Sequence, residues 1–238
     1  MSTPETALHR SGTGTPLNAG TPLSIQGLVD DVTAGLDRLG LDRVHVAGNS
    51  LGGWVGLELA RQGRARSFVG FSPGGAWRSP ARYRAMSVAM DTGVRMMGSL
   101  GDRSDWLATS PRGRRLAARL ACVDPARLDP DEFRADLRAL RATPALRGLM
   151  RTIGATPFQP LPDPGCPIRI VWARRDRVVP FRSFGQPLLE RLPNAELVFL
   201  DGVGHVPMLD RPKAVAALIL EVTSSVDRVA PEPSELSD

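Results

Sequence analysis

A glycine–serine–glycine turn at residues 48–52 constrains the fold of this chain more than any other feature. An apolar strand, Val44–Ala47, precedes it, and Leu51–Arg61 has the pattern of a helix. A serine between such elements sits on a sharp turn that exposes its hydroxyl at the top of a sheet. Glycine is expected two residues before and after Ser50, because side chains there would collide. The pattern predicts a nucleophilic serine, with an ordinary glycine-rich corner as the alternative.

Short apolar strands alternate with amphipathic helices on both sides of this turn. A helix with apolar residues at helical spacing is expected between a Ser24 N-cap and a Gly40 stop. Further strands are expected at 43–47, 66–71, 168–173 and 196–200, and further helices at 183–192 and 212–223. This alternation is typical of a parallel sheet covered on both faces. The sequence therefore predicts an α/β fold with a mostly parallel sheet flanked by helices.

The pattern changes between residues 73 and 164, where helical stretches follow one another without a strong strand. This segment is predicted to be a helical cap inserted into an α/β core formed by residues 24–72 and 165–224. Residues 1–23 are rich in turn formers and are expected to be a loop or a disordered leader. Residues 225–238, with two prolines and several acidic residues, are expected to be a disordered tail.

The net charge of +5 does not predict a nucleic-acid partner. Nearly all basic residues are arginines, Lys213 being the single lysine, and no basic run is interleaved with stacking aromatic residues. No stretch approaches the length that spans a bilayer, and residues 1–20 lack the apolar core of a signal peptide. Cys122 and Cys166 have neither a disulfide-framework pattern nor metal-ligand spacing. These features favour a cytoplasmic protein with no membrane partner.

A nucleophilic serine needs a base and an acid that orients the base. Among the three histidines, His205 follows an apolar strand within a glycine-rich loop that can fold back over the sheet edge. His45 lies inside a strand, where a structural role is favoured. Asp176 lies in the loop after the strand 168–173; the alternative is a surface aspartate paired with neighbouring arginines. Asp201 is a rival acid, although it lies close to His205 along the chain.

The order Ser50, Asp176, His205 resembles that of the α/β-hydrolase superfamily with a helical cap. The stretches that carry the resemblance are Gly48–Gly53, Trp172–Pro180 and Gly204–Met208, which appear in the order of the family. The resemblance implies Ser50 as nucleophile, His205 as base and then acid, and Asp176 as orienting acid. It further implies one oxyanion donor in the backbone N–H of Leu51, and no metal or organic cofactor.

The resemblance also predicts several strands before Ser50, one of them ending in a His–Gly loop that supplies a second oxyanion donor. Residues 1–24 contain no such strand and no His–Gly pair. The chain is therefore expected to be N-terminally shortened, with strand 43–47 at a sheet edge that a second copy can cover. Loss of one oxyanion donor costs roughly 10²–10³ in turnover, so a weakly active or inactive chain is expected.

The function predicted from these features is hydrolysis of a small or medium apolar ester by a serine hydrolase. Seven large apolar side chains of the helical segment offer surface for such a substrate, or else pack the segment on the core: Trp77, Tyr83, Met86, Met90, Met96, Met97 and Trp106. The asparagine before Ser50, Asn49, is similar to what carbon–carbon bond hydrolases of aromatic degradation carry in this turn. These enzymes have a tryptophan directly after the catalytic histidine, where this chain has Val206. A cofactor-free perhydrolase and a catalytically weak binding protein are further alternatives.

Overall fold

The computed structural model describes residues 24–99, 105–141, 149 and 152–229. The expected leader, residues 1–23, lies outside the described residues. The elements follow one another as α1 (Ile25–Arg38), β1 (Val44–Asn49), α2 (Leu51–Arg61), β2 (Ala65–Phe71), α3 (Pro80–Ser99), α4 (Asp105–Thr109), α5 (Pro111–Ala118), η2 (Pro125–Arg127), α6 (Pro130–Arg141), η3 (Ile153–Ala155), β3 (Ile168–Ala173), α8 (Gly185–Leu189), β4 (Glu196–Leu200), α9 (Pro207–Asp210) and α10 (Pro212–Val229).

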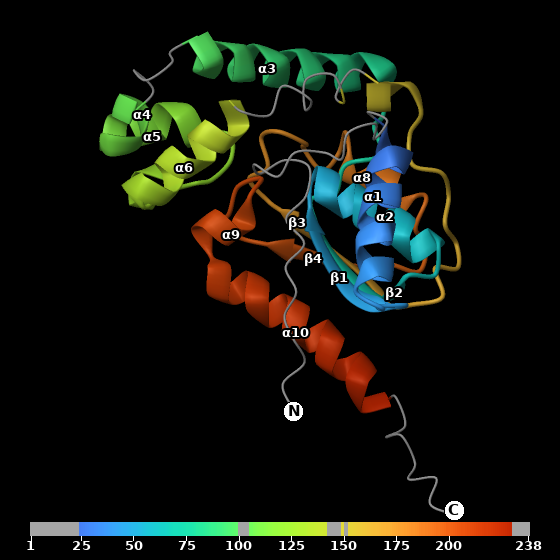
Figure 1. Cartoon of the computed structure of the whole chain (residues 1–238). Coiled ribbons are helices and arrows are strands. Elements are labelled where there is room, and N and C mark those ends of the chain that lie inside the picture. The colour runs from blue at the N-terminus through green and yellow to red at the C-terminus, as the bar shows by residue number, and fades with distance from the viewer. Residues whose placement is uncertain (1–23, 100–104, 142–148, 150–151, 230–238) are drawn as a thin grey trace, which may run out of the picture.

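In the described part of the chain, four strands form one sheet in the order β1-β2-β3-β4 (Figure 1). Each neighbouring pair of strands is parallel. The expected α/β fold with a mostly parallel sheet is confirmed. Because all four strands run in one direction, their carboxyl ends meet at the same edge of the sheet.

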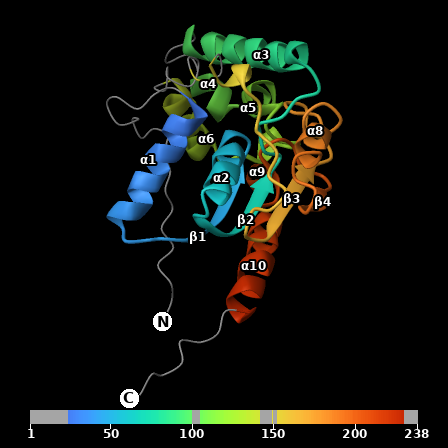
Figure 2. The same ribbon diagram turned by 90° about the vertical axis from the view of Figure 1, so that its right-hand side faces the viewer.

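Side chains of the strands alternate between two apolar layers, as the period of a β-strand requires. Ile170 and Trp172 of β3 pack on the side of α1, α2 and α8, in the larger core cluster. Val171, between them, packs with Val69 of β2 and Val215 of α10 on the other side. Figures 1 and 2 show α10 apart from α1 and α2. Both faces of the sheet are thus covered by helices.

Helix α1 begins and ends where the sequence predicts. The Ser24 hydroxyl accepts a hydrogen bond from the Gly27 N–H at 3.0 Å, which caps the first turn. At the other end Gly40 adopts φ +68° and donates its N–H to Asp37 O at 3.0 Å. A residue with a Cβ adopts this left-handed conformation only at a cost, so glycine suits the position after the helix.

The residues between β2 and β3 form helices gathered at one end of the sheet (Figures 1 and 2). Helices α4, α5 and α6 share a small apolar cluster of their own, which includes Leu107, Phe133 and Leu137. Trp77 and Tyr83 instead join the main core, with their ring centroids 4.4 Å apart, and Met86 packs against it. These three side chains pack the segment on the core, the second of the two expectations, whereas Met96 and Trp106 are exposed.

Helix α10 ends at Val229, beyond the expected end near residue 223, so residues 225–229 are helical where a tail was predicted. The last turn is held by Asp227, whose carboxylate lies 3.1 Å from His45 Nε2 and 2.8 Å from an Arg66 nitrogen. Both partners belong to the start of the sheet, in β1 and β2. These long-range contacts attach the last turn of the helix, in a stretch whose composition suggests disorder, to the sheet.

The Asp227→Asn variant is expected to lower the melting temperature by at most a few degrees at pH 7. The hydrogen bond from His45, with the charges of His45 and Arg66, lowers the pKa of Asp227. A carboxyl group with a lowered pKa stabilises the fold above its unfolded pKa, near 4 for a free aspartate, and less as the pH falls below it. The difference between variant and wild type in thermal scans should therefore shrink toward pH 3. A constant difference from pH 7 to pH 3 would contradict the ion-pair origin.

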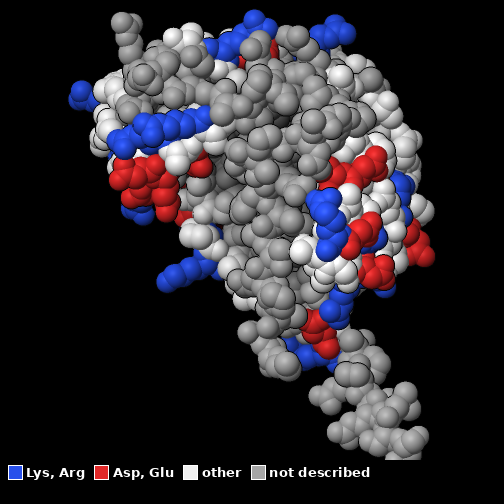
Figure 3. All heavy atoms as spheres, viewed as in Figure 1, with Lys and Arg blue, Asp and Glu red and all other residues white. Residues whose placement is uncertain are grey.

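Charged side chains of both signs are interspersed on the face that Figure 3 shows, over the residues described there. Many are paired within the chain; Arg169, for example, bonds Glu196 at 2.8 Å and Glu221 at 2.7 Å. None of the helices in the described ranges has the length and apolar character needed to cross a membrane.

Candidate active site

Ser50 occupies the turn between β1 and α2 in a conformation rare for a residue with a side chain. Its φ is 54° and its ψ −117°, and its N–H donates to Phe71 O at 3.0 Å. Its carbonyl oxygen accepts from Trp54 N at 3.2 Å and from Gly74 N at 2.8 Å. Three hydrogen bonds therefore hold the backbone in a strained geometry, as is found where a side chain must be presented for function.

The two glycines flanking Ser50 are not equivalent. A Cβ on Gly48 would lie 2.4 Å from Gly52 O, so this position admits glycine alone. A Cβ on Gly52 would meet nothing within 4 Å. The expectation that both are required by the turn is wrong for Gly52. The second tight position is Gly53, where a Cβ would lie 2.9 Å from the Pro73 Cβ, because the loop after β2 packs against the start of α2.

This difference predicts opposite effects of two alanine substitutions four residues apart. Gly48→Ala should destabilise the fold by about 1–3 kcal/mol, because it drives a methyl group into backbone. Gly52→Ala should stabilise it by up to about 1 kcal/mol, because alanine restricts the unfolded chain and has free space here. Urea unfolding of both variants measures the difference. An equal loss of stability in both would show that the turn is packed differently.

His205 and Asp176 form a buried hydrogen-bonded pair. His205 Nδ1 lies 2.8 Å from Asp176 Oδ2, with 7% and 1% of the two side chains exposed. Asp176 Oδ1 accepts the backbone N–H groups of Val178 at 2.9 Å and Val179 at 2.8 Å. Because an ionised carboxylate only accepts hydrogen bonds, Nδ1 carries the imidazole proton and Nε2 has a free lone pair. This is the tautomer that a general base requires.

The alternatives for the acid are distinguished by their partners. Asp201 forms an ion pair with Arg174 at 3.0 Å, and 76% of its side chain is exposed. Among the described residues, Asp176 forms no ion pair with an arginine of its loop, and its carboxylate is turned inward. The structure therefore brings Asp176, and not Asp201, to the imidazole.

Asn49 joins the serine turn to the histidine loop. Its side-chain amide donates one hydrogen bond to Phe71 O and one to His205 O, both at 2.9 Å. The structure has no hydrogen bond between the Ser50 hydroxyl and the His205 imidazole, both of which are described residues. Such contacts are often long without substrate and shorten in the reacting complex. The backbones of the two residues are nevertheless held to each other through one side chain.

Leu51 is the first residue of α2. The N–H groups of the first turn of a helix have no acceptor within the helix and carry a partial positive charge. No acceptor for the Leu51 N–H occurs elsewhere in the described structure. This group is therefore available to a negatively charged oxygen bound beside Ser50.

A second set of serine, histidine and aspartate lies at the other end of the strands, near the amino ends of β1 and β2. Ser67 Oγ is 2.7 Å from His45 Nδ1, and His45 Nε2 is 3.1 Å from Asp227 Oδ1. Ser67 is fully buried in β2, with 0% exposed, so no substrate reaches its hydroxyl. This set links β1, β2 and α10, and the favoured structural role of His45 agrees with its contacts.

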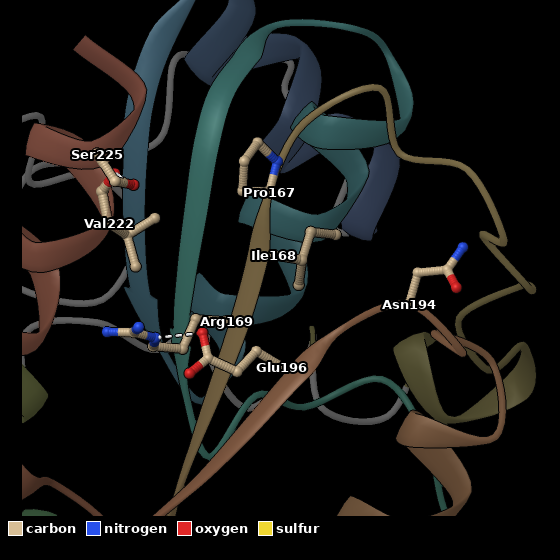
Figure 4. Close-up of a pocket in the computed structure, with 7 residues that line it drawn as sticks. All are labelled: Pro167, Ile168, Arg169, Asn194, Glu196, Val222 and Ser225. Carbon is tan, nitrogen blue, oxygen red and sulfur yellow. Dashed lines mark hydrogen bonds and ion pairs between the residues drawn. The ribbon is translucent and has the colours of Figure 1, made fainter. Parts of the chain in front are cut away.

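A hollow of about 220 Å³ lies at the amino ends of β3 and β4 (Figure 4). It is lined by Pro167, Ile168, Arg169, Asn194, Glu196, Val222 and Ser225. Because Ser50, Asp176 and His205 follow the carboxyl ends of their strands, this hollow is at the wrong end of the sheet for them. Its one guanidinium is already paired with Glu196 and Glu221.

Two polar residues beside Ser50, Asp176 and His205 were not predicted from the sequence. Ser72 follows β2 with φ 41°, and its buried hydroxyl accepts the Ala173 N–H at 3.3 Å, which ties the ends of β2 and β3. Asp210 accepts N–H groups from Gly204 and from the α5–η2 loop. The Ser72–Pro73 pair at the end of β2 could have indicated a tight turn at this position. No local pattern indicates the partners of Asp210.

Comparisons with known proteins agree with this fold. The model of the alpha/beta hydrolase family matches residues 6–218. Epoxide hydrolase EphH of Mycobacterium tuberculosis is 34% identical over 210 residues, which cover 86% of this chain and 95% of that protein. A 2-hydroxy-6-oxononadienedioate/2-hydroxy-6-oxononatrienedioate hydrolase of Cupriavidus pinatubonensis is 26% identical over 86% of this chain and 70% of its own length. A thermophilic esterase from Thermogutta terrifontis has a similar structure, with a TM-score of 0.60, 18% identity, and coverage of 85% of this chain and 73% of the esterase.

Proposed function

Because this chain belongs to the alpha/beta hydrolase family, we propose that it is a serine hydrolase that cleaves a small or medium apolar ester. Ser50 is the nucleophile, His205 the general base and then acid, and Asp176 the group that orients the imidazole. The observation that carries the proposal is the buried His205–Asp176 hydrogen bond of 2.8 Å at the sheet edge that also bears Ser50.

The proposed reaction has two steps that use the same residues. Ser50 Oγ adds to the ester carbonyl while His205 Nε2 takes its proton, and the Leu51 N–H stabilises the oxyanion. Collapse of this intermediate breaks the ester C–O bond, and the imidazolium gives its proton to the departing alcohol. Water then adds to the acyl-enzyme with His205 again as base, and release of the acid restores Ser50.

Residues 73–164, which carry the helices between β2 and β3, are proposed to act as a cap over Ser50. The loop between α5 and η2 touches the loop that carries His205, since Val206 N donates to Ala121 O at 2.7 Å. A substrate at Ser50 would therefore lie between the sheet edge and these helices. Such a place suits an ester with an apolar acyl or alcohol part, because helices over the site limit its access to water.

The relative named epoxide hydrolase suggests a second reaction, which the chemistry of Ser50 disfavours. Attack of a serine oxygen on an epoxide carbon forms an ether, which has no carbonyl group for water to add to. Attack on an ester carbonyl forms an acyl-enzyme, which the same histidine can help water to hydrolyse. A hydroxyl nucleophile thus turns over esters and would be trapped by epoxides.

Carbon–carbon bond cleavage of a ring-fission product is the other candidate, because a relative is named for such a substrate. Asn49 was the sequence feature in its favour. In the structure its amide group donates to two backbone carbonyls, Phe71 O and His205 O, so this residue has a local role that does not depend on the substrate. An ester therefore remains the better supported substrate class.

Labelling with a fluorophosphonate, together with hydrolysis of p-nitrophenyl acetate and butyrate, tests the proposal. An activated serine reacts quickly, so mass spectrometry of digested protein should place the label on the peptide that contains Ser50. Heat-denatured protein is the control and should stay unlabelled. Styrene oxide, an epoxide, and a 2-hydroxy-6-oxodienoate, a substrate for carbon–carbon bond cleavage, are assayed in parallel to test the two other reactions. Turnover of either of these without ester hydrolysis, or a native chain that is not labelled, would overturn the proposal.

A further inference from the structure

The carboxylate of Asp210 collects backbone N–H groups from two distant segments. Its Oδ2 accepts from Gly204 N at 2.8 Å, directly before His205. Its Oδ1 accepts from Val123 N at 2.9 Å and from Asp124 N at 3.3 Å, both in the loop between α5 and η2. Hydrogen bonds to a charged acceptor are among the stronger ones in proteins. One side chain thus binds the histidine loop to the helical segment.

These two segments are in close contact where Asp210 joins them. A Cβ on Gly204 would lie 2.8 Å from both Ala121 O and Cys122 Cα, so even a methyl group would force the segments apart. Val206 N donates to Ala121 O at 2.7 Å on the other side of His205. The residue before the histidine and the residue after it are therefore both attached to the α5–η2 loop.

The hydrogen bonds that stabilise the carboxylate of Asp210 come from these backbone N–H groups. In the described ranges no arginine or lysine forms an ion pair with it. Burial, and after it the charges of Asp210 and Asp124, raises the pKa of the adjacent Cys122 thiol to about 12. The Asp210 carboxylate thus lies where the two segments meet and is partly buried.

We propose that Asp210 is a positioning residue, which sets the place of the His205 imidazole by clamping Gly204 to the α5–η2 loop. This inference rests on the proposed function, because it concerns the base of that reaction. Asn49 fixes the carbonyl group of His205 to the serine turn, and Asp210 fixes the preceding amide to the helical segment. The placement of the cap helices and the placement of the base are thereby coupled.

Asp210→Asn keeps a polar side chain of the same size but replaces one of the two acceptor oxygens by an NH₂ group, so it tests the positioning role. Val123 N also lies 3.1 Å from Oδ2, so it can bond to either oxygen, whereas Gly204 needs Oδ2 and Asp124 needs Oδ1. The asparagine amide has a single acceptor oxygen, so it keeps Gly204 or Asp124 but not both, and its NH₂ group faces the other N–H. We expect kcat for p-nitrophenyl butyrate to fall about 10–10²-fold with little change in KM, because a displacement of about 1 Å has an effect of this size. The rate of phosphonylation of Ser50 should fall by the same factor. Asp124→Asn is the matched control, since that carboxylate lies at the same joint and pairs with Arg127; it should stay within twofold of wild type.

Amide hydrogen exchange and the imidazole signal of His205 give readouts that do not depend on turnover. In Asp210→Asn, exchange at Val123, Asp124 or Gly204 should quicken, and the Nδ1–H proton resonance of His205 should shift. Kinetics are measured well below the melting temperature, so a simple loss of stability leaves kcat unchanged. A lowered melting temperature with kcat within twofold of wild type would overturn the positioning role. If wild type neither hydrolyses esters nor reacts with the phosphonate, the proposed function fails; unchanged exchange and an unchanged imidazole signal would overturn the clamp itself.

Discussion

Replacing Ser50 by alanine is expected to abolish fluorophosphonate labelling and to lower kcat for p-nitrophenyl butyrate by roughly 10⁴–10⁶-fold. The loss is this large because the serine oxygen forms the bond to the acyl carbon, and without that bond His205 and the Leu51 N–H have no acyl-enzyme to form or to hydrolyse. Ester binding does not need the hydroxyl, so KM should change little. The fold should be retained, because the three hydrogen bonds that hold the turn involve backbone atoms of Ser50.

Ser67→Ala is the matched control for Ser50→Ala. Ser67 is also a serine within 3 Å of a histidine, since its hydroxyl is 2.7 Å from His45 Nδ1, and it is buried in β2. Its loss removes a hydrogen bond between β1 and β2, which should reduce stability by about 1 kcal/mol and leave turnover nearly unchanged. Loss of activity in Ser67→Ala with activity retained in Ser50→Ala would show that the reaction belongs to the Ser67–His45 set and that the proposal is wrong. Rates measured on both variants alongside thermal scans decide between the two.

The parts of the fold that depend on neighbours in sequence could be predicted. Strands 168–173 and 196–200 have the expected bounds, because continuous apolar runs flanked by turn formers indicate buried parallel strands. The start of α1 at Ser24 and its end at Gly40 follow from side-chain capping and from glycine's access to positive φ. The turn at Ser50 could be recognised from its five-residue pattern, although two of the three hydrogen bonds that hold it come from Phe71 and Gly74.

The features that depend on distant partners could not be predicted. Composition placed residues 225–229 in a tail, whereas the structure has them helical, with Asp227 in contact with His45 of β1 and Arg66 of β2. Spacing did not single out Gly53, whose close contact is with Pro73 of the loop after β2. The contacts of Asn49 and Asp210 with the His205 loop join residues 156 and 6 positions apart, and Asp210 reaches the α5–η2 loop across 87 positions. Only the folded backbone brings those groups together.

Asp176→Asn should reduce kcat by roughly 10⁴-fold without disrupting the fold, and the reason lies in the two oxygens of the carboxylate. Oδ1 accepts the N–H groups of Val178 and Val179, so the single oxygen of an asparagine is required there. Its NH₂ group then faces His205 Nδ1, which must become an acceptor. The imidazole proton moves to Nε2, where it blocks acceptance of the Ser50 proton. The variant thus holds the ring in place in the wrong tautomer.

Asp201→Asn tests whether this effect belongs to one carboxylate or to acidic residues of these loops in general. Asp201 follows β4 and is exposed and paired with Arg174, so its neutralisation should leave kcat within twofold of wild type. The ¹⁵N shifts of the His205 ring give the tautomer directly and should differ from wild type in Asp176→Asn alone. A loss below tenfold in Asp176→Asn, with the ring still protonated at Nδ1, would mean that another group orients the imidazole. A loss in Asp201→Asn equal to that in Asp176→Asn would point instead to the charge of the loops, because Asp201 makes no hydrogen bond to the ring in the described structure.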